Sequence, residues 1–169
     1  WGLVPSWAKD ASGGGRLINA RSETAADKPS FRSAMRHRRC LVPADGFYEW
    51  RAEGGAKQPY RIVRPDGAPF AMAGLWERWT KGDEPLETFT ILTTAANDTL
   101  RPLHERMPVI LSPADYALWL DPTATDVALV EPLLAPAADD ALTLYPVGRA
   151  VNVVGNDGPS LIARVDVPA

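Results

Sequence analysis

One carboxylate stands out in the sequence because two large rings flank it: Glu49 lies between Tyr48 and Trp50. The tight turn at 44–46 comes shortly before it. A carboxylate in a partly dry site has a raised pKa and suits proton transfer, whereas a solvent-facing strand carboxylate keeps its ordinary pKa. The neighbouring residues leave both interpretations open, and the solvent-facing one is the commoner.

Two further polar residues, His104 and Asn19, also stand among apolar or turn residues. A histidine can take up or release a proton near neutral pH, although a histidine that caps a turn is the simpler alternative. The segment around His104 cannot form the helix of a zinc protease, because the second histidine is missing and Pro108 interrupts a helix. No other metal-ligand cluster is visible, so neither a metal nor another cofactor is expected.

Cys40 is the sole cysteine, and two aliphatic residues follow it. This pattern predicts a buried strand residue rather than a reactive nucleophile. A single cysteine excludes an internal disulfide framework and a multi-cysteine zinc site. The sequence also has no phosphate-binding loop and no nucleophile elbow of the Gly-Xaa-Ser-Xaa-Gly type.

Composition predicts one globular domain over residues 1–169, with 46% hydrophobic and 23% charged residues. No apolar run approaches the roughly 20 residues of a membrane helix, and no signal peptide is visible. The net charge of −3 argues against general nucleic-acid affinity. However, residues 1–64 hold 12 Lys/Arg and 6 Asp/Glu, a net charge of +6. The other 105 residues hold 6 Lys/Arg and 15 Asp/Glu, a net charge of −9. This asymmetry indicates a local anion-binding face, unless the two parts interleave in space and cancel.

Six tryptophans are many for this length, and most should lie in the core. Some of them, near Arg21 and Arg106, could stack on bases, since aromatic stacking beside cations is how single strands are held.

Short strands must position these residues. Residues 17–24 should begin as a strand with Asn19, Arg21 and Glu23 on one face, because side chains alternate along a strand. Residues 12–15 are expected to form a flexible loop. The stretch 29–37 should be a helix with an apolar stripe of Phe31, Ala34 and Met35. Further strands are predicted at 40–42, 47–51, 60–64, 70–76, 88–93, 143–147 and 161–165, turns at 53–55 and 65–67, and helices at 112–120 and 126–134. The predicted class is α+β: one strand-rich domain with a curled, barrel-like mixed or antiparallel sheet and short flanking helices.

Several long motifs occur in order along the chain. They are Trp1-Gly2-Leu3-Val4-Pro5-Ser6-Trp7, Asn19-Ala20-Arg21-Ser22-Glu23-Thr24, Arg39-Cys40-Leu41-Val42-Pro43-Ala44-Asp45-Gly46-Phe47-Tyr48-Glu49-Trp50, Thr93-Thr94-Ala95-Ala96-Asn97 and His104-Glu105-Arg106-Met107-Pro108. Together they resemble the SOS-response-associated peptidase (SRAP) family, whose members shield abasic sites in single-stranded DNA by crosslinking to them. Val151-Asn152 and Asn156-Asp157 are similar to its C-terminal motif.

The resemblance implies a site and a chemistry. The family uses an N-terminal cysteine, whose α-amine and thiol form first an imine and then a thiazolidine with the aldehyde of an abasic sugar. An α-amine has a pKa near 7.7–8.0, so a useful fraction is nucleophilic at neutral pH. The implied roles are orientation of that amine by Asn19, proton transfer by Glu49, assistance by His104, phosphate binding by Arg21 and Arg106, and stacking or wedging by Trp1 and Met107.

The implied partner is single-stranded DNA containing abasic sites, with no membrane, no metal and a monomeric, cytoplasmic, nucleoid-associated protein. The resemblance also implies lyase-like chemistry and autoproteolytic exposure of the cysteine. The sequence departs from the family in one respect: the nucleophile would lie before Trp1, and Cys40 matches an internal position instead. These 169 residues alone are therefore expected not to crosslink. Two alternatives stay open: a non-catalytic barrel that binds single-stranded nucleic acid, and a peptidase acting on other proteins, for which no nucleophile is present.

Overall fold

A computed structural model of the chain describes residues 1–53 and 55–166. The chain divides into two compact units. The first comprises Trp1–Pro43, Ala71–Ala95 and Met107–Ala137, and the second comprises Ala44–Phe70, Ala96–Arg106 and the chain from Ala138 onward. The predicted turn at 53–55 includes residue 54, which lies outside the described residues, as do the last three residues of the predicted domain.

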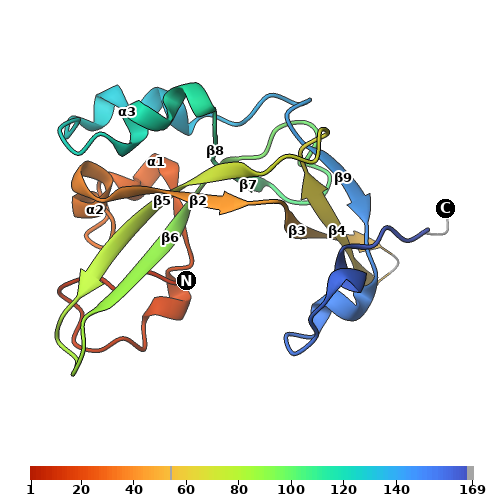
Figure 1. Cartoon of the computed structure of the whole chain (residues 1–169), viewed down its shortest axis with the longest axis horizontal. Helices are drawn as coiled ribbons and strands as arrows, with labels where there is room; N and C mark the ends of the chain where they lie inside the picture. The colour runs from red at the N-terminus through yellow and green to blue at the C-terminus, as the bar shows by residue number, and fades with distance from the viewer. Residues whose placement is uncertain (54, 167–169) are drawn as a thin grey trace. The chain divides into compact units, whose positions relative to one another are not determined.

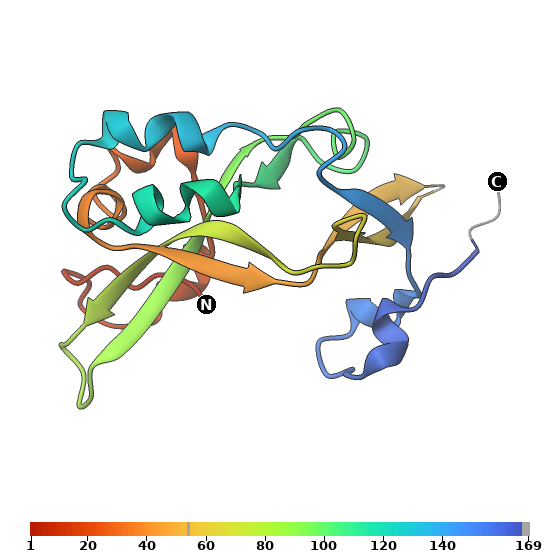
Figure 2. The ribbon, with the colours of Figure 1, turned by 45° about the horizontal axis from the view of Figure 1, so that its top comes forward.

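A six-stranded sheet organises the first unit. Its strands follow the order β1 (Asn19–Arg21), β6 (Leu86–Ala95), β5 (Phe70–Trp79) and β2 (Arg39–Ala44), while β7 (Arg106–Pro108) pairs with β6 and β8 (Ile110–Leu111) with β5. Strand β1 is parallel to β6, and β5 is antiparallel to β6 and to β8. In Figures 1 and 2, β5 and β6 run side by side to their connecting hairpin.

The first unit also contains short helices, several of which contribute residues to its core. They are α1 (Ser22–Ala25), α2 (Arg32–His37) and α3 (Tyr116–Leu120), with the 3-10 turns η1 (Gly14–Arg16), η2 (Pro113–Asp115), η3 (Val127–Leu129) and η4 (Glu131–Leu134). The core combines the predicted stripe of Phe31, Ala34 and Met35 with Leu75 and Leu92 from the sheet. The prediction of a buried helical stripe is thus confirmed.

One strand prediction and one helix prediction need correction. Strand β1 ends at Arg21, and Glu23 lies in the first turn of α1, where a carboxylate suits the positive end of the helix. Glu23 therefore does not share a strand face with Asn19 and Arg21. The helix predicted over 126–134 is two 3-10 turns instead, because Pro132 at the start of η4 has no N–H for an α-helical ladder.

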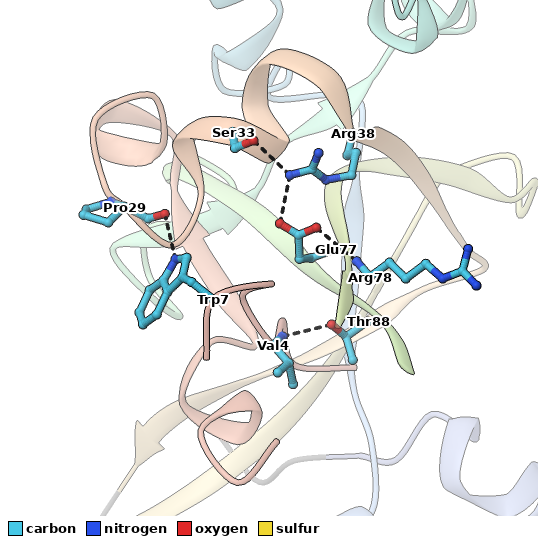
Figure 3. A network of polar contacts seen from close by, with 8 residues as sticks. All are labelled: Val4, Trp7, Pro29, Ser33, Arg38, Glu77, Arg78 and Thr88. Carbon is cyan, nitrogen blue, oxygen red and sulfur yellow. Dashed lines mark hydrogen bonds and ion pairs between the residues drawn. The ribbon is translucent and has the colours of Figure 1, made fainter. Parts of the chain in front are cut away.

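The basic end of α2 is largely structural. The Arg38 guanidinium contacts Glu77 on β5 at 2.8 Å and Ser33 Oγ at 3.0 Å (Figure 3). Arg39 is only 8% exposed and donates to backbone carbonyls. Arg38 and Arg39 thus bind within the protein, which weakens the sequence argument for an anion-binding face here.

The glycine-rich loop packs closely against the chain start. Gly2 has φ +115°, and a Cβ there would lie 2.6 Å from Gly14 O. Gly14 itself is buried. Because both backbones meet without side chains between them, the predicted flexible loop is instead a packed turn, and glycine is required at position 2.

A three-stranded antiparallel sheet organises the second unit, in the order β3 (Phe47–Glu53), β4 (Ala56–Val63), β9 (Thr143–Pro146). The 3-10 turns η5 (Arg149–Asn152) and η6 (Pro159–Ile162) follow β9. The turn predicted at 65–67 is confirmed: Gly67 has φ +70° and donates to Arg64 O at 3.0 Å. The strand predicted at 161–165 is wrong, because η6 occupies its first half and only a single bridge joins Arg164 to Val147.

The strand-rich α+β class is confirmed, but the barrel is not. Closing a barrel requires the first and last strands of a sheet to pair. Here the strands form two separate sheets, and within the described residues each sheet ends in open edges, β1 and β2 in one and β3 and β9 in the other. The part of the chain that the structure describes contains no helix long and apolar enough to cross a bilayer.

Candidate functional site

Glu49 is a half-buried strand residue with altered acidity. It lies in the middle of β3 and faces Tyr60 of β4 across the sheet. Burial raises the pKa of the Glu49 carboxyl, and three groups oppose this rise: the positive charge of His104, the backbone N–H of Trp50 and the charge of Lys57. The structure therefore favours the partly dry interpretation, in which the carboxyl holds a proton more readily than in water.

His104 is exposed and lies close enough to Glu49 for its charge to act on that carboxyl. Its Nδ1 accepts the backbone N–H of Arg106 at 3.0 Å and lies 3.2 Å from the carbonyl oxygen of Arg106. Since Nδ1 accepts, the neutral ring carries its proton on Nε2. When the ring is protonated, Nδ1–H can donate to the carbonyl, so the same backbone holds both protonation states. The turn-capping role and the chemical role are thus compatible.

Asn97 positions this loop, a role the sequence analysis missed. It is 6% exposed, its Oδ1 accepts from Leu100 N at 3.0 Å, and its Nδ2 donates to Ala138 O at 3.2 Å. His104 N donates to Leu100 O at 3.1 Å, which closes the turn that Asn97 starts. The signal was present in the sequence, because an asparagine that starts a turn often caps it.

Asn19 and Arg21 project from the same face of β1, on either side of the buried Ala20. The indole N–H of Trp1 donates to Ile18 O at 2.8 Å, and the Trp1 side chain is 66% exposed. The first unit therefore places an exposed ring, an amide and a guanidinium along one short edge strand. The predicted common face of Asn19 and Arg21 is confirmed.

Cys40 lies on this same face of the six-stranded sheet. Asn19 pairs with Ile91 of β6, and Ile91 pairs with Gly74 of β5, so a side chain at position 74 would lie on the same face as Asn19. A Cβ built on Gly74 would lie 2.8 Å from Cys40 Sγ. A pocket of about 290 Å³ is lined by Cys40, Trp76 and other residues of β2, β5 and β6. Burial raises the pKa of the Cys40 thiol to about 11, so the thiol is protonated at neutral pH. This supports its predicted structural role.

Arg106 and Met107, which follow His104-Glu105 in the same motif, differ in what they offer. Arg106 is half-buried, and its backbone holds the imidazole. Met107 is only 1% exposed. This burial leaves almost no Met107 surface exposed in the structure, and the wedge role stays a prediction.

The predicted site residues thus fall into two sets. Glu49, His104 and Arg106 belong to the second unit, while Trp1, Asn19 and their neighbour Arg21 belong to the first. Among residues 1–53 and 55–166, no group of three or more His, Cys, Asp or Glu side chains could hold a metal ion. One unit thus holds a carboxyl of raised pKa near an imidazole, and the other holds a polar, cationic strand edge.

Comparison with known proteins gives a consistent picture. The family model described as "SOS response associated peptidase (SRAP)" matches residues 1–154. The abasic site processing protein YoqW of Bacillus subtilis is 45% identical over 164 residues, covering 96% of this chain and 73% of the relative. The abasic site processing protein YedK of Escherichia coli is 38% identical over 171 residues, covering 98% and 73%. A crystal structure of a protein from Bacteroides thetaiotaomicron superposes with a TM-score of 0.88 at 35% identity, covering 98% of this chain and 75% of that one.

Proposed function

This chain belongs to the SOS response associated peptidase (SRAP) family, and we propose that it processes abasic sites in single-stranded DNA. The observation that carries the proposal is the pairing of Glu49 and His104 in one unit, a carboxyl of raised pKa beside a backbone-held imidazole. The relatives named for abasic site processing supply the substrate class. Residues 1–154, which the family model matches, draw on both units, so we treat them as one functional domain.

The proposed reaction is covalent capture of the ring-opened sugar. The α-amine of an N-terminal cysteine adds to the C1′ aldehyde, and the resulting carbinolamine loses its hydroxyl as water to give an imine. The cysteine thiol then adds to the imine carbon, its proton moves to the nitrogen, and a thiazolidine results. No oxidant or reductant is needed. The 169 residues contain Cys40 as their sole cysteine, and its protonated, half-buried thiol does not take this role.

Glu49 supplies and removes the protons of this sequence. In its acid form it protonates the departing hydroxyl, and as a carboxylate it accepts the proton that the amine loses. A carboxyl with a raised pKa suits both steps better than an ordinary glutamate, because general acids and bases work best with a pKa near the working pH. His104, with Nδ1 held by Arg106, exchanges protons through Nε2 with the sugar hydroxyl or the leaving phosphate.

The remaining residues bind the DNA and the amine. Asn19 orients the amine through its amide, Arg21 and Arg106 contact the flanking phosphates, and Trp1 stacks at the abasic gap. The exposure of Asn19 and Arg21 on the edge strand, and of Trp1, which hydrogen-bonds to Ile18 just before that strand, supports these roles. The same Glu49–His104 pair would also remove residues that precede the reactive cysteine.

A crosslinking assay tests the proposal. The full-length natural protein, with its N-terminus exposed, is incubated with single-stranded DNA that contains one abasic site. A heat-stable adduct on denaturing gels is expected. The matched control is the same oligonucleotide after borohydride reduction of its aldehyde, which should give none. Equal, salt-dependent binding of intact and abasic strands without any adduct would instead support a non-catalytic binding protein.

Two variants assign the chemistry. Glu49→Gln keeps the shape but cannot transfer a proton, and it should slow adduct formation by about 10²- to 10⁴-fold. His104→Asn keeps an acceptor for the Arg106 N–H but loses Nε2, so it should slow the reaction while leaving the turn intact. If Glu49→Gln crosslinks at the wild-type rate, the proposed proton transfer by Glu49 is refuted.

A further inference from the structure

The C-terminal motif Val151-Asn152 contacts the strand that carries the proton-transferring carboxyl. The indole N–H of Trp50 donates to Asn152 Oδ1 at 2.7 Å, across 102 residues of sequence. Trp50 directly follows Glu49 on β3, so the two side chains point to opposite faces of the sheet. A contact that fixes Trp50 from one face therefore acts on the backbone that orients Glu49 on the other.

Strand β3 depends on such a contact because it is an edge strand. In the order β3-β4-β9, the described part of the sheet pairs β3 on one side only. Edge strands twist and fray more easily than central ones, since half of their backbone groups lack a ladder partner. The β4 pairing fixes the register of Glu49 opposite Tyr60 but leaves the outer edge of β3 open.

The segment that supplies Asn152 is itself anchored to β4. Val147 N donates to Pro59 O at 3.1 Å, and the buried Gln58 donates through Nε2 to Val147 O at 2.9 Å. Pro59 is the register partner of Trp50. The segment is therefore held to β4 at Pro59, the residue that pairs with Trp50. At the last residue of η5, Asn152, it contacts Trp50 itself.

A second asparagine fixes the turn. Asn156 Nδ2 donates to Ala150 O at 2.9 Å, and Asn156 N donates to Val153 O at 2.9 Å. Both members of the C-terminal motif thus belong to one bracket, defined as residues 147–156, which contacts β3 through the Trp50–Asn152 hydrogen bond.

We propose that Asn152 is a positioning residue for Glu49, holding the β3 edge through Trp50. Loss of the Asn152 acceptor lets the edge strand move and misplaces the Glu49 carboxyl relative to His104. Misplacement of a proton-transferring group slows the reaction without removing any group that touches DNA. The kinetic part of this inference rests on the proposed function of Glu49.

The kinetic test compares two substitutions of similar size. Asn152→Leu removes the acceptor, whereas Asn152→Asp keeps an oxygen for the Trp50 indole. In the abasic-DNA crosslinking assay, Asn152→Leu should lower the maximal rate about tenfold and leave the half-saturating DNA concentration unchanged, while Asn152→Asp stays within about twofold of wild type. Equal rates for all three proteins would overturn the inference, and so would a change confined to the half-saturating concentration.

Trp50→Phe provides a second variant that keeps the ring but lacks the donor. It should match Asn152→Leu, and the double variant should be no slower than either single one, because both remove the same hydrogen bond. Additive losses would mean that the two residues act separately, which would refute the positioning route.

A readout independent of activity separates this inference from the proposed function. The carboxyl of Glu49 can be titrated by ¹³C NMR in the wild type and in the variants. A loosened edge admits water, so Asn152→Leu should move the Glu49 pKa down toward its ordinary value, and Asn152→Asp should not. An unchanged Glu49 titration in Asn152→Leu refutes the positioning role. If the wild type forms no adduct but this titration shifts, the proposed function fails and the positioning stands.

Discussion

Arg39 offers a sharp test of whether the basic cluster of the N-terminal part binds DNA or builds the protein. Its guanidinium donates to four carbonyl oxygens: Met35 at 2.9 Å and Arg36 at 3.1 Å at the end of α2, and Trp119 at 2.7 Å and Asp121 at 2.6 Å at the end of α3. It also lies 5.6 Å from the Trp119 ring centroid. One side chain thus satisfies carbonyls that both helix ends leave without intrahelical partners.

The expected cost of Arg39→Met follows from these contacts. The carbonyls of Met35 and Trp119 are buried, and each would cost about 1–3 kcal/mol when left without a donor. The carbonyls of Arg36 and Asp121 are only partly buried and can be rehydrated. Removal of a buried cation returns part of the desolvation cost, so we expect a net loss of about 3 kcal/mol in the free energy of unfolding. For a chain of this size that lowers Tm by about 6–12 °C.

Thermal unfolding followed by circular dichroism measures this loss, with Arg36→Met as the matched control. Arg36 is exposed, and its substitution should change the free energy of unfolding by less than about 0.5 kcal/mol. Below the Tm, Arg39→Met should bind single-stranded DNA with an unchanged salt dependence. A Tm within 1 °C of wild type together with a reduced salt dependence would show that Arg39 contacts DNA and would refute the structural assignment.

Three further predictions use other parts of the chain. Because the pKa of Glu49 is raised in the folded state, the free energy of unfolding falls as pH rises from the ordinary pKa to the raised one. Glu49→Gln should remove this fall, and its Tm at pH 7 should be no lower than that of wild type. A series of Tm measurements from pH 4 to 8 checks both outcomes. Gly2→Ala should lower the free energy of unfolding, measured with denaturant, by about 1–3 kcal/mol, because Gly2 has a positive φ and a Cβ there would lie 2.6 Å from a carbonyl oxygen. Gly15→Ala is the control and should cost little, since open space surrounds Gly15. Equal losses for the two variants would contradict the packing argument. Arg21→Ala should lower the slope of log affinity against log salt by about 0.7 for single-stranded DNA, with Arg36→Ala unchanged, and an unaltered slope would remove Arg21 from the phosphate contacts.

Local structure could be predicted where one physical cause decided it. The Pro65–Gly67 turn follows from fixed proline φ and glycine at positive φ, and the stripe of α2 follows from helical periodicity. The predictions failed where a neighbour in space decided the outcome. Gly14, for example, packs against Gly2 instead of forming a loose loop. The helix over 126–134 failed for a different reason, because the local signal of Pro132 was overlooked.

The site shows the same division. Residue types and ordered motifs singled out Glu49 and His104, but their mutual influence spans 55 positions and arises only from the folding of the second unit. The family resemblance implied a stacking or wedging role for Met107, yet packing leaves this residue only 1% exposed. The local bond of Asn97 to Leu100 could be read from the sequence, but its bond to Ala138 and the Trp50–Asn152 bond could not, since they span 41 and 102 residues.

By itself, the sequence determined the family, the strand-rich class, the chemistry available to Glu49 and His104, and the shared face of Asn19 and Arg21, because ordered motifs and strand alternation are properties of the linear chain. Only the tertiary structure decided that the sheets stay open, that Arg39 is a structural cation and that the Glu49 carboxyl is partly dry. Desolvation, hydrogen-bond geometry and sheet closure depend on which distant residues meet, and no local pattern specifies those meetings.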